Sequence, residues 1–306
     1  MNLNPINQTK LYGLENYLYE FVKLYKKDKL PNKILLSGLK GVGKCTLAYH
    51  LINYILSEND DNPYNLDKLI INSENKTFKL IQNGTCPNYN LIDVNFDKKN
   101  IDISQIRNLI INLNKSSFNS KPRFVLIDNI EYLNLNSVNA LLKILEEPND
   151  NIHFILIHNN KKIISTLLSR CLNFKISLNN QQINQINHFL FENDLKNLIH
   201  EDFIDYYNTP GNIYNLFKFA KEKEIDLKKI DLKKFLSLII EKSYFKEDIK
   251  IKNLSYDLTE FFLLKKISVF YYELSSYFLK KIKQTKNFNL DDETLFLEIN
   301  SKLLNE

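Results

Sequence analysis

The sequence feature that most constrains the fold is a glycine-rich segment, Gly38 to Thr46, which reads Gly-Leu-Lys-Gly-Val-Gly-Lys-Cys-Thr. The apolar run at 33–37 before it predicts a strand, and the pattern at 46–56 after it predicts a helix. Glycines at such a turn let successive backbone N–H groups face phosphate oxygens, and the amino end of the helix adds its dipole. The segment therefore predicts a phosphate-binding loop, with a tight glycine turn and an incidental lysine as the alternative.

The residue types in this loop indicate nucleotide binding but do not favour magnesium chemistry. Lys44 is the residue expected to reach the β- and γ-phosphates. Cys45 stands where such loops place a Ser or Thr hydroxyl on Mg2+, and a thiol is a soft ligand for that hard ion. Thr46 lies one residue too late to replace it. ATP with Mg2+ is therefore an open expectation, and the candidate nucleotide-binding residues of the loop are Gly38, Gly41, Gly43, Lys44, Cys45 and Thr46.

Two further apolar runs, at 123–128 and 153–158, predict buried strands. Between them, residues 137–145 carry apolar side chains at helical spacing, and the pattern stops at Pro148. Apolar strands that alternate with helices are typical of a parallel sheet covered on both faces. We therefore expect an α/β fold for the first part of the chain.

The apolar run at 123–128 ends in Asp128, an acid of the kind that holds Mg2+ through water in phosphate-loop proteins. A surface acid at a strand end is the alternative. Active ring-forming ATPases usually place next a Glu that polarises the attacking water, whereas here Asn129 follows and Glu131 lies two residues further on. Because an amide cannot act as a general base, we expect little or no ATP hydrolysis by this site.

The remainder of the chain is expected to be helical. A length of 306 residues exceeds one typical domain, so two or three domains are expected. After the Pro210-Gly211 break, apolar residues recur at three- and four-residue steps from Leu258 to Ile282, with no Gly or Pro between them. This stripe predicts one long amphipathic helix, whose aromatic side chains favour a core or subunit face over a base-stacking platform.

Charge, cysteine spacing and the length of apolar runs argue against several classes of protein. Residues 1–176 carry 22 basic and 16 acidic side chains (+6), and the remainder carries 19 and 20 (−1), which sums to the net charge of +5. This is a weak phosphate-facing bias, so direct DNA contact is expected to be modest. The three cysteines lack zinc-site spacing, and neither a signal peptide nor a run of about 18 apolar residues is visible. We expect no zinc, no membrane partner and a cytoplasmic location.

Two sequence blocks resemble motifs of bacterial clamp-loader ATPases. Residues 139–148 read Asn-Ala-Leu-Leu-Lys-Ile-Leu-Glu-Glu-Pro, and residues 168–171 read Leu-Ser-Arg-Cys. Ile-Ser-Gln-Ile-Arg at 103–107 fits the same order. Gly-Lys-Cys-Thr-Leu-Ala at 43–48 is similar to the Gly-Lys-Ala-Thr-Leu-Ala loop of delta-prime subunits. Over nearly its whole length, the sequence therefore resembles the delta-prime subunits of bacterial DNA polymerase III, which are AAA+ proteins.

The resemblance implies three domains. An AAA+ phosphate-loop α/β domain would span 1–176, a small helical lid 177–222, and a helical collar that closes a pentamer 223–306. Many relatives also carry a four-cysteine zinc module after the phosphate-loop helix. Here the stretch 57–90 contains only Cys86, so this module is not expected.

The resemblance also implies roles for single residues. In the family, the arginine of the Ser-Arg-Cys motif points at the γ-phosphate held by the neighbouring subunit, and Arg170 matches this position. A surface arginine or an internal ion pair is the alternative for Arg170. Asn159 matches the sensor position only loosely, and a loop-capping Asn is equally favoured. Active motor subunits keep an arginine at the start of a lid helix, whereas the comparable stretch 209–213 has no basic side chain.

These features favour the stator subunit of a clamp loader, which helps load the sliding clamp on primed DNA and supplies Arg170 to an adjoining ATPase subunit. The expected partners are gamma/tau and delta subunits in a hetero-pentamer, with the clamp and primer-template DNA contacted indirectly. The alternative is an active AAA+ motor, either gamma/tau-like or a related remodeller, and Cys45 and Asn129 argue against it. A phosphate-loop kinase for a small substrate would not account for the helical extension after residue 176.

Overall fold

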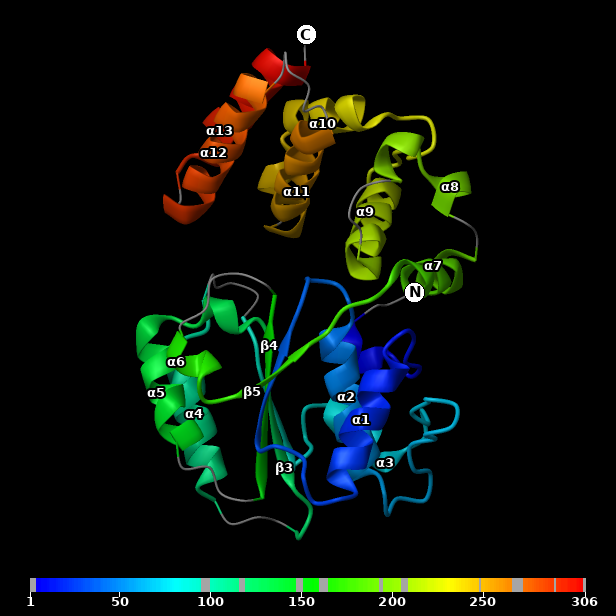
Figure 1. Ribbon diagram of the computed structural model, residues 1–306, viewed down its shortest axis with the longest axis vertical. Coiled ribbons are helices and arrows are strands. Elements are labelled where there is room, and N and C mark those ends of the chain that lie inside the picture. Colours follow the sequence, from blue (N-terminus) through cyan, green and yellow to red (C-terminus); the bar gives the residue numbers. More distant parts are fainter. Residues whose placement is uncertain are drawn as a thin grey trace. The chain divides into compact units, whose positions relative to one another are not determined.

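The chain folds into two compact units, Met1–Ile183 and Asn184–Glu306, in the computed structural model of the protein (Figure 1). The structure describes residues 4–94, 100–115, 119–146, 151–159, 165–192, 195–204, 209–247, 249–265, 272–288 and 290–304.

The first unit is built on a parallel sheet. Among the described residues it has five strands in the order β2-β3-β4-β1-β5, and every adjacent pair is parallel. The three central strands are almost wholly buried, which explains their continuous apolar runs. The strands are β1 (Lys33–Ser37), β2 (Tyr89–Ile92), β3 (Arg123–Ile127), β4 (Ile152–His158) and β5 (Leu172–Lys175).

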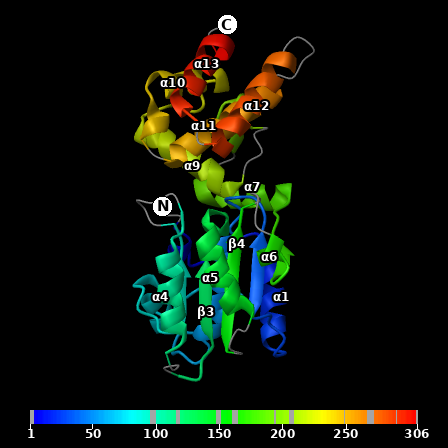
Figure 2. The ribbon, with the colours of Figure 1, turned by 90° about the vertical axis from the view of Figure 1, so that its left-hand side faces the viewer.

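Helices cover both faces of this sheet (Figures 1 and 2). Side chains alternate along a strand, so Ile34 and Leu36 of β1 pack in one core while Leu35 packs in the other. The first core is shared with α1 (Glu15–Tyr25), α2 (Lys44–Leu56) and α3 (Lys76–Gln82), and the second with α4 (Ile103–Leu113) and α5 (Leu135–Glu146). The short α6 (Ser165–Leu168) precedes β5, and α7 (Asn180–Phe191) follows it. The predicted α/β class with a parallel sheet is therefore confirmed.

The second unit consists of helices joined by turns, with no strand among its described residues. Its core extends from Ile199 to Leu304 and centres on phenylalanines such as Phe203 and Phe235, whose rings pack edge to face. The separate lid and collar within this region remain a prediction. The helices are α8 (Leu195–Leu198), α9 (Pro210–Glu222), α10 (Leu232–Glu241), α11 (Ile249–Lys265), α12 (Tyr272–Phe288) and α13 (Asp292–Ile299).

The single long helix predicted from the aromatic stripe is wrong, because α11 and α12 are separate helices that pack against each other. Lys286 Nζ on α12 lies 2.7 Å from Glu260 Oε1 on α11. One straight helix would hold these two residues about 39 Å apart at 1.5 Å per residue. Residues 266–271 between the helices lie outside the described residues. The sequence offers no Gly or Pro there to signal the break.

A buried histidine on α2 forms hydrogen bonds with two loops of the first unit. His50 is fully buried; its Nε2 donates to the Gln8 carbonyl at 3.1 Å, which leaves Nδ1 to accept from the Tyr64 hydroxyl at 2.8 Å. This arrangement requires the neutral imidazole. Burial lowers the pKa of His50 to about 4, although the bond to the Gln8 carbonyl acts in the opposite direction.

The contribution of His50 to stability should therefore be lost in mild acid. Because the unfolded imidazole, with a pKa near 6.5, binds a proton more readily than the buried one, this contribution falls as pH drops from about 6.5 to about 4, by on the order of 3 kcal/mol. Other groups titrate in the same window, so the measured quantity is the difference in free energy of unfolding between the native protein and His50→Gln, from urea unfolding at each pH. This difference should shrink by that amount as pH falls, whereas the difference from His188→Gln, which alters an exposed histidine, should change little. A difference between native protein and His50→Gln that does not vary with pH would contradict this assignment.

Candidate functional site

The predicted nucleotide-binding residues meet at one edge of the sheet. Because all strands are parallel, their carboxyl ends lie together. Gly38 follows β1, Asp128 follows β3 and Asn159 follows β4. Asp93, which follows β2, joins them and was not predicted, because Asn90 interrupts the short strand before it and no apolar run marks that strand in the sequence.

The phosphate-loop glycines adopt backbone conformations that other residues rarely reach. Gly41 has a φ of 84° and Gly43 a φ of 96°. Gly43 is the residue at the amino cap of α2, so the loop runs directly into the helix, and Lys44 is its first residue. Thr46 lies half-buried in the first turn of α2. The loop therefore delivers its backbone N–H groups and a helix amino end to one place, which suits an anion.

The Lys44 ammonium is enclosed by the loop itself. Lys44 is only 4% exposed, and its Nζ donates to the carbonyls of Gly38 (3.0 Å) and Leu39 (2.6 Å). Burial lowers its pKa to about 8, opposed by the negative charges of Asp128 and Glu131. At neutral pH the amine thus stays mostly protonated. A bound phosphate would have to replace the two carbonyl contacts.

The position expected for a magnesium ligand holds a thiol hydrogen-bonded to an acid. Burial raises the pKa of the Cys45 thiol well above its usual value, so the protonated thiol donates to the Asp128 carboxylate. Burial, together with Asp93, also raises the pKa of Asp128 to about 6, while the Asn129 backbone N–H, at 2.8 Å, lowers it. A neutral thiol at the position that such loops give to a hydroxyl does not fit Mg2+, which prefers hard oxygen ligands.

Side-chain amides connect the ends of three strands. Asn159 Nδ2 donates to Asn129 Oδ1 and to Glu131 Oε1, both at 3.0 Å. Asn129 Nδ2 in turn donates to Asp93 Oδ1 at 2.8 Å. The Glu131 carboxylate, two residues later than a catalytic acid would stand, is thus occupied by an amide. This network fits a binding edge better than a hydrolytic one, since Asn129 has no basic group to activate water.

Arg170 lies apart from this edge. Its Nη2 contacts Glu146 Oε1 at 2.8 Å and its Nη1 donates to the Thr166 carbonyl at 3.0 Å. Leu172, two residues later, pairs with Ile34 at the start of β1. Gly38 lies four residues further along, about 13 Å at 3.3 Å per strand residue. The structure therefore does not bring Arg170 to the phosphate loop of its own chain.

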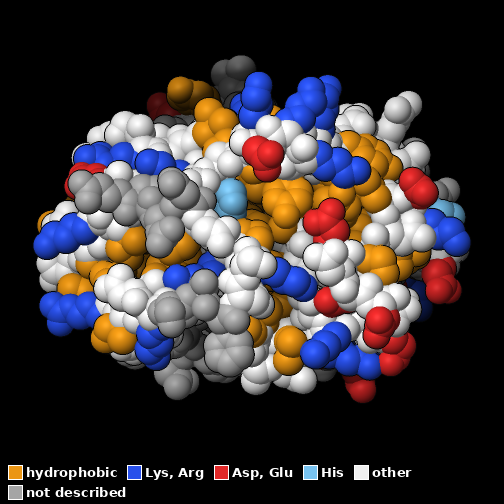
Figure 3. Space-filling model, turned by 90° about the horizontal axis from the view of Figure 1, so that it is seen from below, with side chains coloured by type: hydrophobic (Ala, Val, Ile, Leu, Met, Phe, Trp, Pro, Cys, Tyr) orange, Lys and Arg blue, Asp and Glu red, His pale blue; other side chains and the backbone are white. Residues whose placement is uncertain are grey.

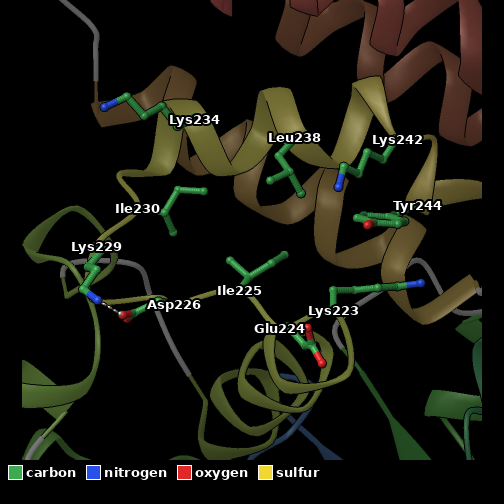
Figure 4. Close-up of a pocket in the computed structure, with 10 residues that line it drawn as sticks. All are labelled: Lys223, Glu224, Ile225, Asp226, Lys229, Ile230, Lys234, Leu238, Lys242 and Tyr244. Carbon is green, nitrogen blue, oxygen red and sulfur yellow. Dashed lines mark ion pairs between the residues drawn. The ribbon is translucent and has the colours of Figure 1, made fainter.

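A separate pocket of about 360 Å³ occurs within the second unit (Figure 4). Apolar side chains, including Leu238 and Tyr244, form part of its lining, and four lysines surround them. Lys229 is paired with Asp226 at 3.2 Å, which offsets part of the positive charge. None of the predicted site residues lines it. The lining residues are Lys223, Glu224, Ile225, Asp226, Lys229, Ile230, Lys234, Leu238, Lys242 and Tyr244.

The parallel sheet, the glycine-rich loop after β1 and the acid after β3 define the first unit as an AAA+-type phosphate-loop α/β domain. The family model for "DNA polymerase III, delta subunit" matches residues 13–180, more than half of the chain. The chain belongs to this family, which confirms the family that its motif blocks resemble. None of the described helices has the length and apolar character needed to cross a membrane.

Curated relatives include both delta-prime and gamma subunits. The gamma subunit of DNA polymerase III from Buchnera aphidicola subsp. Schizaphis graminum is 31% identical over 189 residues, which are 61% of this chain and 50% of the relative. The delta-prime subunit from Pseudomonas aeruginosa is 31% identical over 139 residues, 45% of this chain and 40% of the relative. The chain thus spans half or less of the length of these relatives.

A solved structure shows the same fold over nearly the whole chain. It is a DNA polymerase III gamma subunit-related protein from Thermotoga maritima, with a TM-score of 0.54 and 16% identity. The match covers 94% of this chain and 97% of that one. At this identity the likeness concerns the fold alone.

Proposed function

We propose that this chain is the delta-prime stator of a bacterial clamp loader, which presents Arg170 to the ATP held by an adjoining subunit. The observation that carries the proposal is the separation of Arg170 from its own phosphate loop, since register places them about a strand length apart. An arginine in that position serves a neighbour or no nucleotide at all. Guanidinium suits the task because it is planar, permanently charged and bidentate toward phosphate.

The surroundings of Arg170 support a subunit contact. Leu168 is 38% exposed and Leu172 is 54% exposed, on either side of the arginine in the sequence. Exposed apolar side chains beside a charged group are typical of an interface, where they exclude water around the contact. The proposal therefore places the neighbouring nucleotide against this end of α6 and β5.

The chain's own phosphate loop supports a role without turnover. Cys45 and Asp128 are hydrogen-bonded to each other, and Asn129 replaces the acid that a hydrolytic site needs. We therefore propose that the chain hydrolyses little or no ATP alone, whether or not nucleotide occupies the loop. It acts as a non-catalytic subunit of the polymerase III holoenzyme.

The proposed partners are gamma/tau and delta subunits in a hetero-pentamer. Their joint role would be to load the sliding clamp on primed DNA. On the face drawn in Figure 3, basic and acidic side chains are interspersed with hydrophobic ones. This mixture agrees with indirect or modest contact to DNA phosphates.

Reconstitution tests the proposal against an active motor. The chain should co-purify with gamma/tau and delta subunits as a hetero-pentamer and should be required for DNA-stimulated ATP turnover by that assembly. The purified chain alone should show no Mg2+-dependent hydrolysis above background. Strong hydrolysis by the isolated chain, abolished by Lys44→Ala, would instead favour the motor.

Replacing the thiol should restore sensitivity to magnesium. Cys45→Thr places a hard hydroxyl oxygen beside Asp128. In this variant the nucleotide affinity measured with Mg2+ should therefore be about tenfold higher than the affinity measured with a metal chelator. In the native protein, Mg2+ should change affinity little. Calorimetric titration with ADP and with ATP measures both. Cys171→Ser, outside the loop, is the matched control, and an equal Mg2+ effect in the native and Cys45→Thr proteins would contradict this account.

A further inference from the structure

The Arg170 side chain is held in place by two contacts from its own chain. Glu146 at the end of α5 contacts Nη2, and the Thr166 carbonyl in α6 accepts from Nη1. The elements α5 and α6 contact each other and lie side by side in Figure 1. Glu146 therefore lies 24 residues away in the sequence but directly beside the proposed finger. Glu146 belongs to the motif block 139–148, but nothing in that block indicates a contact with Arg170.

Helix stability does not account for the position of Glu146. It is the last residue of α5, where the partial negative charge of the helix end disfavours a carboxylate. The Leu145 carbonyl beside it is already bound by Lys33 Nζ at 3.0 Å. The pair with Arg170 is partly exposed, with side-chain exposures of 54% and 32%, and such pairs contribute little to folding.

The two contacts orient the guanidinium but leave some of its N–H groups available for a phosphate. Arginine has five N–H donors in a rigid plane, and the described residues occupy two of them. The remaining donors suffice for a bidentate contact with phosphate. A free arginine side chain has many rotamers, and fixing it in advance reduces the entropy lost on contact.

We propose that Glu146 is the positioning residue of Arg170 and holds the guanidinium ready for the γ-phosphate of a neighbouring subunit. This inference rests on the proposed function of Arg170. Glu146 touches no nucleotide and acts only through the arginine. The pair persists while the phosphate engages the free N–H groups.

Variants of Glu146 in the assembled loader test this role. Glu146→Ala should lower kcat for DNA-stimulated ATP hydrolysis about fivefold, equivalent to about 1 kcal/mol, with KM for ATP unchanged. Glu146→Gln, which still accepts a hydrogen bond, should recover most of the rate. Glu74→Ala, which removes another exposed ion pair of the same unit, should leave kcat unchanged.

The Arg170→Ala background separates positioning from a general structural effect. There, Glu146→Ala should cause no additional loss, because the residue it orients is gone. An additional loss in that background, a rise in kcat, or an unchanged kcat in Glu146→Ala alone would overturn the inference. If Arg170→Ala lowers turnover but Glu146→Ala does not, only the positioning role fails. If neither variant changes turnover, the proposed function of Arg170 fails as well.

Discussion

Arg170→Ala is expected to abolish hydrolysis at one ATP site of the assembled loader without disrupting the assembly. An arginine supplied in trans contributes on the order of 10³–10⁵ in rate at the site it serves. Single-turnover hydrolysis at that site should fall by about this factor. Steady-state, DNA-stimulated turnover should fall less, because in the proposed pentamer this chain would serve only one of the ATP sites.

The assembly itself should survive the change. Arg170 contributes one partly exposed ion pair and one hydrogen bond to a carbonyl, so its loss costs the fold about 1 kcal/mol or less. Gel filtration of the reconstituted complex would show an intact pentamer. Arg170→Lys should recover little activity, since an ammonium keeps the charge but lacks the planar fork.

Arg107→Ala is the matched control, because Arg107 is exposed on α4 of the same unit. It should leave turnover unchanged. Unchanged turnover in Arg170→Ala, with the complex intact, would exclude the finger assignment. Dissociation of the complex would show instead that Arg170 is a structural contact between subunits.

Much of the nucleotide edge could be predicted because it follows from local patterns. Apolar runs of strand length, a glycine turn and the rule that parallel strands end at one edge place Lys44, Asp128 and Asn159 together. The sequence also revealed the poor fit of Cys45 to Mg2+. It did not reveal that the thiol would bond to Asp128, since that contact joins two different elements.

Contacts between distant segments were the part that sequence reasoning missed. Asp93 meets Asn129 from 36 residues away, and Glu146 meets Arg170 from 24 residues away. No periodicity encodes such pairings, because strand order decides which ends become neighbours. The separation of α11 from α12 was missed for a different reason: an uninterrupted apolar spacing looks the same whether one helix or two packed helices produce it.

The second large effect is expected at Gly38, where β1 ends against the segment that follows β5. Gly38 has a φ of 151°, and a Cβ built there would lie 2.2 Å from the backbone oxygen of Ile176. That backbone is fixed, because the Ile176 N–H donates to the Ser37 carbonyl at 2.7 Å and the side chain is buried in the core. Gly38→Ala must therefore separate β1 from the segment after β5.

We expect Gly38→Ala to destabilise the first unit by on the order of 3 kcal/mol or more, because backbone strain adds to a clash with an immobile neighbour. Gly84→Ala is the matched control. Gly84 also has a positive φ, 67°, but nothing lies within 4 Å of its Cβ position, so only strain of about 1 kcal/mol applies. Urea unfolding of both variants measures the difference between their losses of unfolding free energy. Equal losses would contradict the prediction, because they would show that the backbone at Ile176 moves aside to relieve the clash.

Displacing β5 should also affect function, because β5 begins two residues after Arg170. Gly38→Ala should therefore lower the loader's turnover, whereas Gly84→Ala should not.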